Sequence, residues 1–499
     1  MNSVLKNVAA NFLGQGWAAL MGICFVPLYL KFIGIEGYGL IGFFVILSSA
    51  MSMLDGGFGA VATKEASVYE SASSLEKKKV ILLLRSVEWV FWGIALTAGA
   101  VVILLAPLIS NYWLDISPDK LDSVTQSLRV MGGALVLQFP IAFYYGALTG
   151  LQKQVELNIA TSIFATFRSG GTVLVLWLVS PTVEWFFIWQ CVINLLTVFI
   201  LRIQLIRELA GWTDSISFSL DTLRRLRGFA VGVGATNALA FLLMQADKIV
   251  LSKTLSLTDF GYYMLAWTLG TIAFRLISPV FNAYYPKIVA SVASGNAVEA
   301  FGYYIRASQI LSMLVIPFSV WIAFYSHQVL SLWTQDQHIA AAASGPLMIL
   351  VLGTMIHSFM NMPYALQLAH GWTRFSVWQN FIAAVLVVPL TYYLAASYGL
   401  AGSAWPWLLL NIGFFTFCPP IVFKKLNIKP AKTWYIDAIF IPFVISVSLL
   451  YFFKSVFDLL AIDNPVVMLL SLGITYIAVA LRLFVFSVDI RKITWRNAV

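Results

Sequence analysis

Two arginine residues lie near the middle of long apolar stretches of the sequence, where charged residues are rare. Arg168 belongs to the stretch 157–180 and Arg275 to the stretch 259–284. An ionised side chain near the centre of a bilayer costs about 2.5–3.5 kcal/mol, so it needs a partner or water beside it. Two such arginines on polar helix faces favour a water-filled cationic cavity. The alternative that stays open is a salt bridge between helices, with Glu88 or Asp247 as the partner.

Polar residues at helical spacing accompany both arginines and give each stretch one polar face. The residues that share a face with Arg168 are Asn158, Thr161, Ser162, Ser169 and Thr172, and those in line with Arg275 are Trp267, Thr271, Ser278, Asn282 and Tyr285. The predicted binding residues are Arg275, Arg168, Asn282, Trp267, Thr271, Gln245, Asn237, Lys248, Asn11 and Gln15. Lys248 lies near the predicted outer end of its helix, so its ammonium group is expected to extend to the interface.

Several titratable residues inside or beside apolar stretches are candidates for binding a proton or another ion. These candidates are Asp55, Asp247 and His357. Asp55 is expected mainly to be a structural residue at a helix end. Glu88 is expected to pair with Arg85, and His357 and Asn361 are expected to form hydrogen bonds between helices.

Motifs that carry catalysis are absent from the sequence. There is no Gly-Lys dipeptide, so there is no P-loop, and there is no His-Glu-x-x-His pair for a metal. The 4 histidines are scattered. The sequence therefore predicts no catalytic residues, no metal and no cofactor, and we expect that the chain is not an enzyme.

The composition indicates which elements must position these residues. Of 499 residues, 60% are hydrophobic and 11% are charged, whereas soluble domains carry roughly 25% charged residues. We predict an all-α polytopic membrane protein of about 14 transmembrane helices, since each crossing takes about 20 residues. The predicted spans are 7–31, 38–59, 80–108, 126–149, 157–180, 183–206, 228–251, 259–284, 306–326, 342–367, 374–397, 400–422, 434–453 and 464–486.

The positive residues are unevenly distributed between the two sets of loops. With the N-terminus in the cytoplasm, 23 of the 31 lysines and arginines fall on the inner side and 5 on the outer side. Cytoplasmic loops are enriched in lysine and arginine, so we predict that both termini are cytoplasmic. This bias accounts for the net charge of +9 without any nucleic-acid partner.

Short matches between the two halves indicate a parallel internal repeat. Gly37-Tyr38 corresponds to Gly261-Tyr262, and the segment from Pro140 to Lys153 corresponds to the segment from Pro363 to Arg374. Two six-helix bundles related in this way would enclose a central cavity. The predicted domains are a first bundle at 1–210, a second bundle at 211–430, and two additional helices with a cytoplasmic tail at 431–499.

Several motifs resemble a known family. They are Pro27-Leu28-Tyr29-Leu30, Gly37-Tyr38-Gly39, Leu54-Asp55-Gly56-Gly57-Phe58-Gly59, Gly150-Leu151-Gln152, and Asp247-Lys248-Ile249-Val250-Leu251 followed by Gly261-Tyr262-Tyr263. Over roughly residues 5–430 the chain resembles the polysaccharide (O-antigen-type) flippases of the multidrug/oligosaccharidyl-lipid/polysaccharide exporter (MOP) superfamily. Lys248 replaces the commoner arginine, and Gly57 replaces an apolar residue.

The resemblance implies transport of a polyprenyl-diphosphate-linked oligosaccharide across a bacterial inner membrane by alternating access, for surface polysaccharide biosynthesis. Membrane lipid, a polysaccharide polymerase and a chain-length regulator are the implied partners. Related flippases imply that helices 434–453 and 464–486 flank the lipid tail. Two alternatives stay open: a cation-coupled multidrug exporter of the same superfamily, which should have membrane carboxylates and an apolar cavity, and a membrane sugar polymerase.

Overall fold

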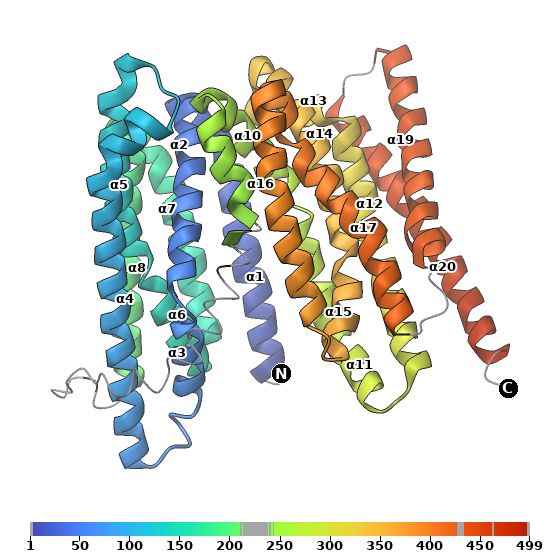
Figure 1. Cartoon of the computed structure of the whole chain (residues 1–499), viewed down its shortest axis with the longest axis horizontal. Helices are drawn as coiled ribbons and strands as arrows, with labels where there is room; N and C mark the ends of the chain where they lie inside the picture. Colours follow the sequence, from blue (N-terminus) through green and yellow to red (C-terminus); the bar gives the residue numbers. More distant parts are fainter. Residues whose placement is uncertain are drawn as a thin grey trace. The chain divides into compact units, whose positions relative to one another are not determined.

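The computed structural model describes residues 3–209, 212, 238, 241–242, 244–426, 434–461 and 464–496, and within them the side chains from residue 13 to residue 484. Across these residues the chain is helical apart from turns and one isolated β-bridge, between Asp115 and Ser256 (Figure 1). Twelve described helical segments are long and apolar enough to cross a membrane, and a shorter apolar helix covers Leu13–Cys24. The predicted all-α polytopic class is confirmed. The predicted seventh span, 228–251, lies largely outside the described residues.

The described elements follow one another in this order: α1 Ser3–Cys24, α2 Val26–Leu54, α3 Phe58–Ser67, α4 Ser74–Leu108, η1 Ile109–Trp113, η2 Pro118–Lys120, α5 Leu121–Gln138, α6 Ile141–Gly150, α7 Gln154–Leu178, α8 Val183–Glu208, α10 Leu257–Gly270, α11 Phe274–Ala293, α12 Ala297–Phe324, α13 Ser326–Thr334, α14 Gln337–Phe359, α15 Asn361–Ala369, α16 Arg374–Ser403, α17 Trp405–Lys425, η3 Trp434–Phe440, α19 Ile441–Leu459 and α20 Pro465–Arg496. Two long helices contain a non-helical glycine, Gly34 in α2 and Gly399 in α16. These positions fall at the predicted limits between spans one and two and between spans eleven and twelve.

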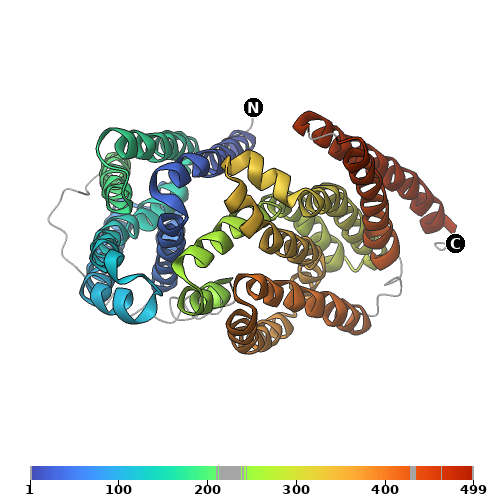
Figure 2. The same ribbon diagram turned by 90° about the horizontal axis from the view of Figure 1, so that it is seen from above.

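The chain divides into two compact units, residues 1–261 and 262–499, whose helices are seen from above in Figure 2. The core of unit 1 packs α4 against α6, where the rings of Phe91 and Phe143 lie 5.6 Å apart. In unit 2, the fully buried Trp434 donates from Nε1 to Oγ of Ser308 at 2.9 Å. Its ring also packs on Phe423, so η3 fixes the start of α19 to the core of unit 2.

Helix breaks recur in corresponding spans of the two units. The second span breaks at residues 55–57 between α2 and α3, and the eighth breaks at residues 271–273 between α10 and α11. The fourth span breaks at Phe139-Pro140, and the tenth at Met360, shortly before Pro363. Proline has no N–H to continue the helical hydrogen bonding, which accounts for a break beside it. Broken helices of this kind provide backbone polar groups to sites inside a membrane.

Glycines permit close contacts between helices where the sequence motifs place them. In α6, Gly146 and Gly150 face α3, and a Cβ atom on Gly150 would lie 2.3 Å from the carbonyl oxygen of Thr63. The motif glycines Gly39 and Gly261 act similarly, because a Cβ atom on either would meet backbone oxygen, of Leu257 and Ile35 respectively. Small residues four apart allow helices to approach closely in a membrane.

The substitution Gly150→Ala is therefore expected to destabilise unit 1. The added methyl group cannot fit without moving α3 away from α6, which costs about 1–3 kcal/mol. The matched control is Gly93→Ala in α4, where an added Cβ atom meets nothing within 4 Å. Alanine is about 1 kcal/mol better than glycine inside a helix, so this control should keep or raise stability. Thermal unfolding of the purified variants in detergent measures both effects, and equal shifts would contradict the close-contact explanation.

Candidate functional site

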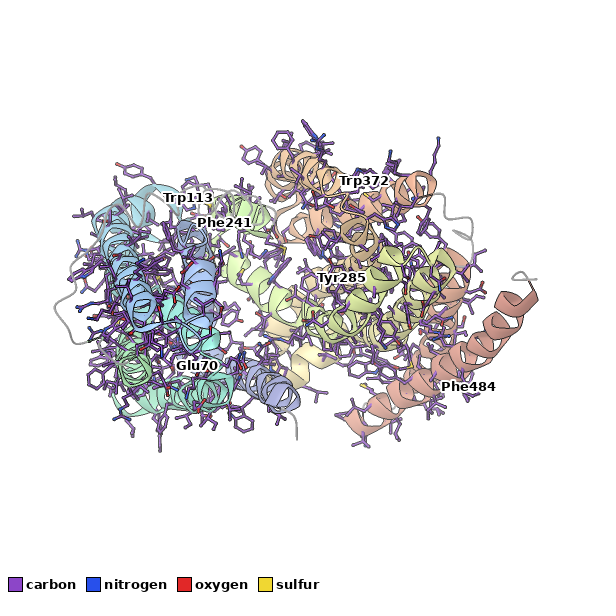
Figure 3. The ribbon with its side chains drawn as sticks, turned by 90° about the horizontal axis from the view of Figure 1, so that it is seen from below. Glu70, Trp113, Phe241, Tyr285, Trp372 and Phe484 are labelled. Atoms are coloured by element: carbon purple, nitrogen blue, oxygen red, sulfur yellow. The ribbon has the colours of Figure 1, made fainter. Side chains whose placement is uncertain are left out.

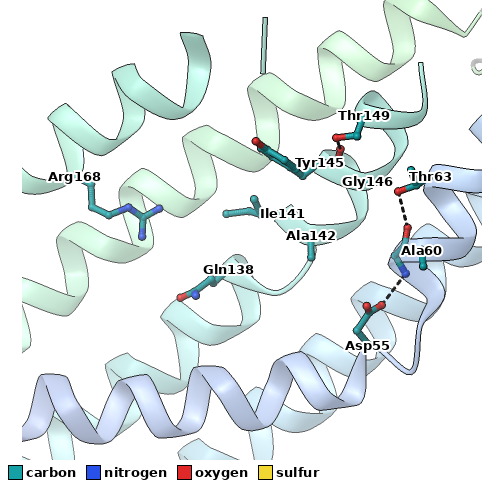
Figure 4. A pocket seen from close by; sticks show the side chains of 11 residues that line it. Asp55, Ala60, Thr63, Gln138, Ile141, Ala142, Tyr145, Gly146, Thr149 and Arg168 are labelled. Atoms are coloured by element: carbon teal, nitrogen blue, oxygen red, sulfur yellow. Dashed lines mark hydrogen bonds between the residues drawn. The ribbon is translucent and has the colours of Figure 1, made fainter. Parts of the chain in front are cut away.

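A cavity of about 760 Å³ lies within unit 1, between the broken second span, the broken fourth span and α7 (Figure 4). Its lining is polar at several points. The lining residues are Asp55, Gly59, Ala60, Thr63, Gln138, Ile141, Ala142, Tyr145, Gly146, Thr149 and Arg168. Of the predicted binding residues in unit 1, Arg168 lies in this cavity, and so does Asp55 from the predicted ion-coupling set.

Two neutral amides on α8 position the guanidinium group of Arg168. Its Nη1 donates to Oε1 of Gln190 at 3.1 Å, and its Nη2 donates to Oδ1 of Asn194 at 2.8 Å. Gln190 in turn donates to Oγ1 of Thr172 at 3.2 Å, and the Asn194 amide donates to the carbonyl oxygen of Ala134 at 3.1 Å. A guanidinium group has five N–H donors, so three of them have no hydrogen-bond partner among the described residues.

The expected salt-bridge partners of Arg168 are engaged elsewhere. Glu88 accepts hydrogen bonds from Nε of Arg202 at 3.0 Å and from the hydroxyl group of Tyr144 at 2.5 Å. Asp247 pairs with Lys248, whose Nζ lies 3.0 Å from its Oδ1. The alternative interpretation, in which Arg168 joins helices through one of these carboxylates, is wrong. The expected pairing of Glu88 with Arg85 is also wrong, since Arg202 from α8 takes that place.

The structure places the three ion-coupling candidates in different settings. Asp55 follows the last residue of α2, and its Oδ1 accepts the backbone N–H of Gly59 at 2.8 Å, which caps α3. Asp247 is buried beside Lys248. His357 makes a 2.9 Å hydrogen bond from Nδ1 to Oδ1 of Asn411, which joins α14 to α17 as expected.

The expected role of Asn361 differs from the observed one. Its amide donates to the carbonyl oxygens of His357 and Ser358 in the preceding turn. These bonds are local, so Asn361 stabilises the break between α14 and α15 and does not join two helices. The position follows Met360, where the helix has already broken and carbonyl groups lack their usual N–H partners.

Arg275 lies at the break of the eighth span in unit 2. It is the second residue of α11, and its exposed side chain has no hydrogen bond or ion pair with any described residue. Pro279, four residues later, lacks the N–H that would bond the Arg275 carbonyl oxygen. Ser278 and Asn282 are also exposed and joined by a 3.4 Å hydrogen bond. The arginine therefore starts an open polar face on α11.

The other predicted residues of this stripe lie on both sides of the break. Thr271 donates to the carbonyl oxygen of Trp267 at 2.7 Å, which satisfies the end of α10. The ring of Trp267 packs edge to face on Trp407, with centroids 5.3 Å apart. Tyr285, labelled in Figure 3, lies further along α11 and stacks on Phe281. Trp267 is thus partly committed to packing in unit 2.

The remaining predicted binding residues have varied placements. Gln245 donates to Oγ of Ser49 at 3.1 Å, and Gln15 is exposed on α1. The side chain of Asn11 and the whole of Asn237 lie outside the described residues. Lys248 has an exposed fraction of 1% and donates to Asp247 and to the carbonyl oxygen of Met244. The expected extension of Lys248 to the interface is therefore wrong, because its ammonium group is fully paired inside unit 1.

Sequence reasoning missed the residues that the broken fourth span brings to the cavity. Gln138 ends α5, and its amide donates to Oγ of Ser48 at 2.8 Å. Tyr145 and Thr149 line the cavity from α6. The signal that could have found them is Pro140, because a proline inside an apolar span predicts a break. Among the described residues, no group of three or more metal-ligating side chains comes together.

Comparison with known proteins agrees with this architecture. The family model for "Polysaccharide biosynthesis protein" matches residues 4–292, and the MatE model matches residues 233–393. A "Putative O-antigen transporter" from Shigella flexneri is 20% identical over 414 residues, covering 81% of this chain and 94% of that protein.

Two solved structures share the fold. Lipid II flippase MurJ in its inward closed conformation has a TM-score of 0.71 and 15% identity, covering 97% of this chain and 99% of its own. An inward-facing multidrug resistance MATE family transporter of the MOP superfamily has a TM-score of 0.61 and 14% identity, covering 83% of this chain and 96% of its own.

The fold and the cavity of unit 1 define a multi-pass helical membrane protein with the fold of the MOP superfamily. Because its family model matches more than half of the 499 residues, the chain belongs to the polysaccharide biosynthesis protein family. The family membership predicted from the motifs is therefore confirmed, and so is the fold that it implies.

Proposed function

We propose that this protein is a flippase that moves a polyprenyl-diphosphate-linked oligosaccharide from the cytoplasmic to the outer leaflet of a bacterial inner membrane. The observation that carries this proposal is the environment of Arg168. A cation inside a cavity of 760 Å³, held by Gln190 and Asn194 and not by a carboxylate, is prepared for an anionic ligand. Guanidinium groups bind phosphate oxygens in pairs of hydrogen bonds.

The rest of each polar face suits the sugars of such a substrate. Hydroxyl, amide and aromatic groups bind sugar hydroxyls and ring faces, and Gln138, Tyr145 and Thr149 supply them beside Arg168. In unit 2, Arg275 and Asn282 supply a second cation and a second amide on an exposed face. We assign Arg275 to the same diphosphate at another stage of transport, with alternating access as the mechanism.

The names of two relatives support a lipid-linked substrate. One is an O-antigen transporter by name, and the other is a lipid II flippase that shares the fold over nearly the whole chain. The competing function is a cation-coupled drug exporter, which the MatE match and the MATE structure support. Asp55 in the cavity of unit 1 is the observation that favours it, because drug cations need a carboxylate.

Leaflet transfer by the purified protein tests the proposal. Vesicles that contain the protein and a fluorescent lipid-linked oligosaccharide should show transfer of the label between leaflets, measured with a membrane-impermeant quencher. The lipid-linked sugar should remain chemically unchanged, because bond formation would indicate a polymerase. Export of cationic dyes without any movement of the lipid-linked sugar would establish the drug exporter instead.

The charge bias gives a separate prediction about topology. Ser74 and Asp122 are both exposed, and the long helix α4 lies between them in the chain. In a variant that lacks Cys24, Cys191 and Cys418, a cysteine at Asp122 should react with an impermeant maleimide added to whole cells, and a cysteine at Ser74 should not. Reaction of Ser74→Cys from outside would contradict a cytoplasmic N-terminus.

A further inference from the structure

An apolar groove runs along unit 2 between α16 and α17, outside both candidate binding faces. Its volume is about 390 Å³, and its lining includes Phe375, Trp378, Leu390, Phe414 and Phe417. The α16 lining residues recur at helical spacing, so the groove follows one face of that helix. Its floor is open at Gly413, where an added Cβ atom would meet nothing within 4 Å.

The groove is longer than one leaflet of a membrane. From Phe375 to Leu390 the helix advances 15 positions, which corresponds to about 22 Å. Half of the hydrocarbon core of a bilayer is about 15 Å thick. A phospholipid acyl chain that stays in its own leaflet follows only part of this length, whereas a section of a long isoprenoid chain can follow all of it.

One end of the groove carries positive charge. Arg374 is the first residue of α16, and Lys424 and Lys425 are the last residues of α17. The two helices are antiparallel and joined by a short turn after Gly399, so these three exposed cations lie at the same end (Figure 1). Basic side chains at the membrane surface attract phosphate groups.

We propose that this groove binds the isoprenoid chain of the lipid-linked substrate, with its diphosphate beside Arg374, Lys424 and Lys425. This assignment rests on the proposed function and adds a place where the lipid binds before its sugar enters the transport path. It differs from the sequence-based expectation, which placed the tail beside the last two helices.

Photocrosslinking to the full-length protein tests the assignment. The probe is undecaprenyl diphosphate with a diazirine in its chain, incorporated with the protein into lipid nanodiscs. Crosslinked peptides should come from residues 375–390 and 409–421. Gly413→Leu, which fills the floor of the groove, should reduce this labelling at least fivefold. The control Gly473→Leu, at an equally open position on α20, should leave it unchanged.

Competition identifies the ligand that the groove recognises. Unlabelled undecaprenyl diphosphate should compete, and phosphatidylglycerol at the same concentration should not. Replacing Arg374, Lys424 and Lys425 with glutamine should weaken competition by undecaprenyl diphosphate at least tenfold. Competition by undecaprenol, which has the same chain without the diphosphate, should stay unchanged. Equal competition by phosphatidylglycerol, labelling confined to α19 and α20, or no effect of Gly413→Leu would each overturn the assignment. Transfer of the oligosaccharide in vesicles without crosslinks in the groove would refute the groove alone, and crosslinks without transfer would refute the flippase function.

Discussion

Arg168→Ala is expected to abolish complementation of a flippase-deficient strain while the protein remains in the membrane. The variant loses the cation of the unit 1 cavity and the N–H donors that we propose bind the diphosphate. Each hydrogen bond to a charged group contributes about 1.5–3 kcal/mol, so the loss of two such bonds should weaken substrate binding at least a hundredfold. Surface polysaccharide and membrane protein level, measured in the same cells, give the result.

Two further substitutions at the same position separate binding from structure. Arg168→Lys keeps the charge but loses the two-pronged geometry, so it should retain part of the activity. Arg168→Gln can still bond to an amide on α8 but has no charge, so it should be inactive. If the arginine served only to join α7 to α8, glutamine would be the better replacement.

The control is Arg129→Ala, which removes an exposed arginine in the middle of α5. It should behave like the unmodified protein, because its longest-range described contact is a weak 3.4 Å bond to Gln126 on the same helix. Arg275→Ala is expected to reduce transport as well, without loss of stability, since Arg275 has no described partner to lose. Normal polysaccharide in both Arg168→Ala and Arg275→Ala would show that neither arginine binds the substrate.

The sequence predicted the helical class because hydrophobic length is a local property of the chain. The limits of spans one, two, eleven and twelve agree with Gly34 and Gly399, where the backbone leaves the helical conformation. The internal repeat also pointed to Pro140 and Pro363, which both lie beside a helix break. What those breaks do is not visible in the residue pattern, because it depends on which helices pack beside them.

Similar residues at corresponding positions of the repeat can have different physical roles. Gly150 lies in a helix contact, where a side chain would collide with Thr63. Gly371, its counterpart, has a φ of 66° and open space around it, so its role is to allow the backbone conformation of a turn. Sequence alignment of the halves finds both glycines, but the choice between close packing and backbone conformation depends on neighbours that are distant in the chain.

Pairing between charged side chains was the least predictable part of the site. Lys248 was expected at the interface because of its place along the chain, yet Asp247 and the Met244 carbonyl group hold it inside unit 1. Glu88 was expected to pair one turn away with Arg85, whereas α8 brings Arg202 to it. Such pairs are decided by how helices pack against one another, and a single sequence does not reveal that.

The pair formed by Glu88 and Arg202 leads to an asymmetric prediction about stability. Glu88 is buried, with an exposed side-chain fraction of 9%, whereas the side chain of Arg202 is 45% exposed. Removing one partner of a buried pair is costly because the other charge remains without compensation, by about 3–5 kcal/mol. An isolated Arg202 can turn towards water, but an isolated Glu88 keeps only the hydroxyl group of Tyr144.

Arg202→Met should therefore destabilise the protein more than Glu88→Gln. We expect a cost of about 3 kcal/mol for Arg202→Met and about 1 kcal/mol for Glu88→Gln, since the amide still accepts from Tyr144 and Arg202 stays solvated. The double variant should recover much of the loss, because no buried charge is then left unpaired. Melting temperatures in detergent should follow the order of these costs, with a drop of about 3–5 °C for Arg202→Met. Equal losses for the two single variants, or a double variant no better than Arg202→Met, would show that the burial of Glu88 does not determine the stability of this cluster.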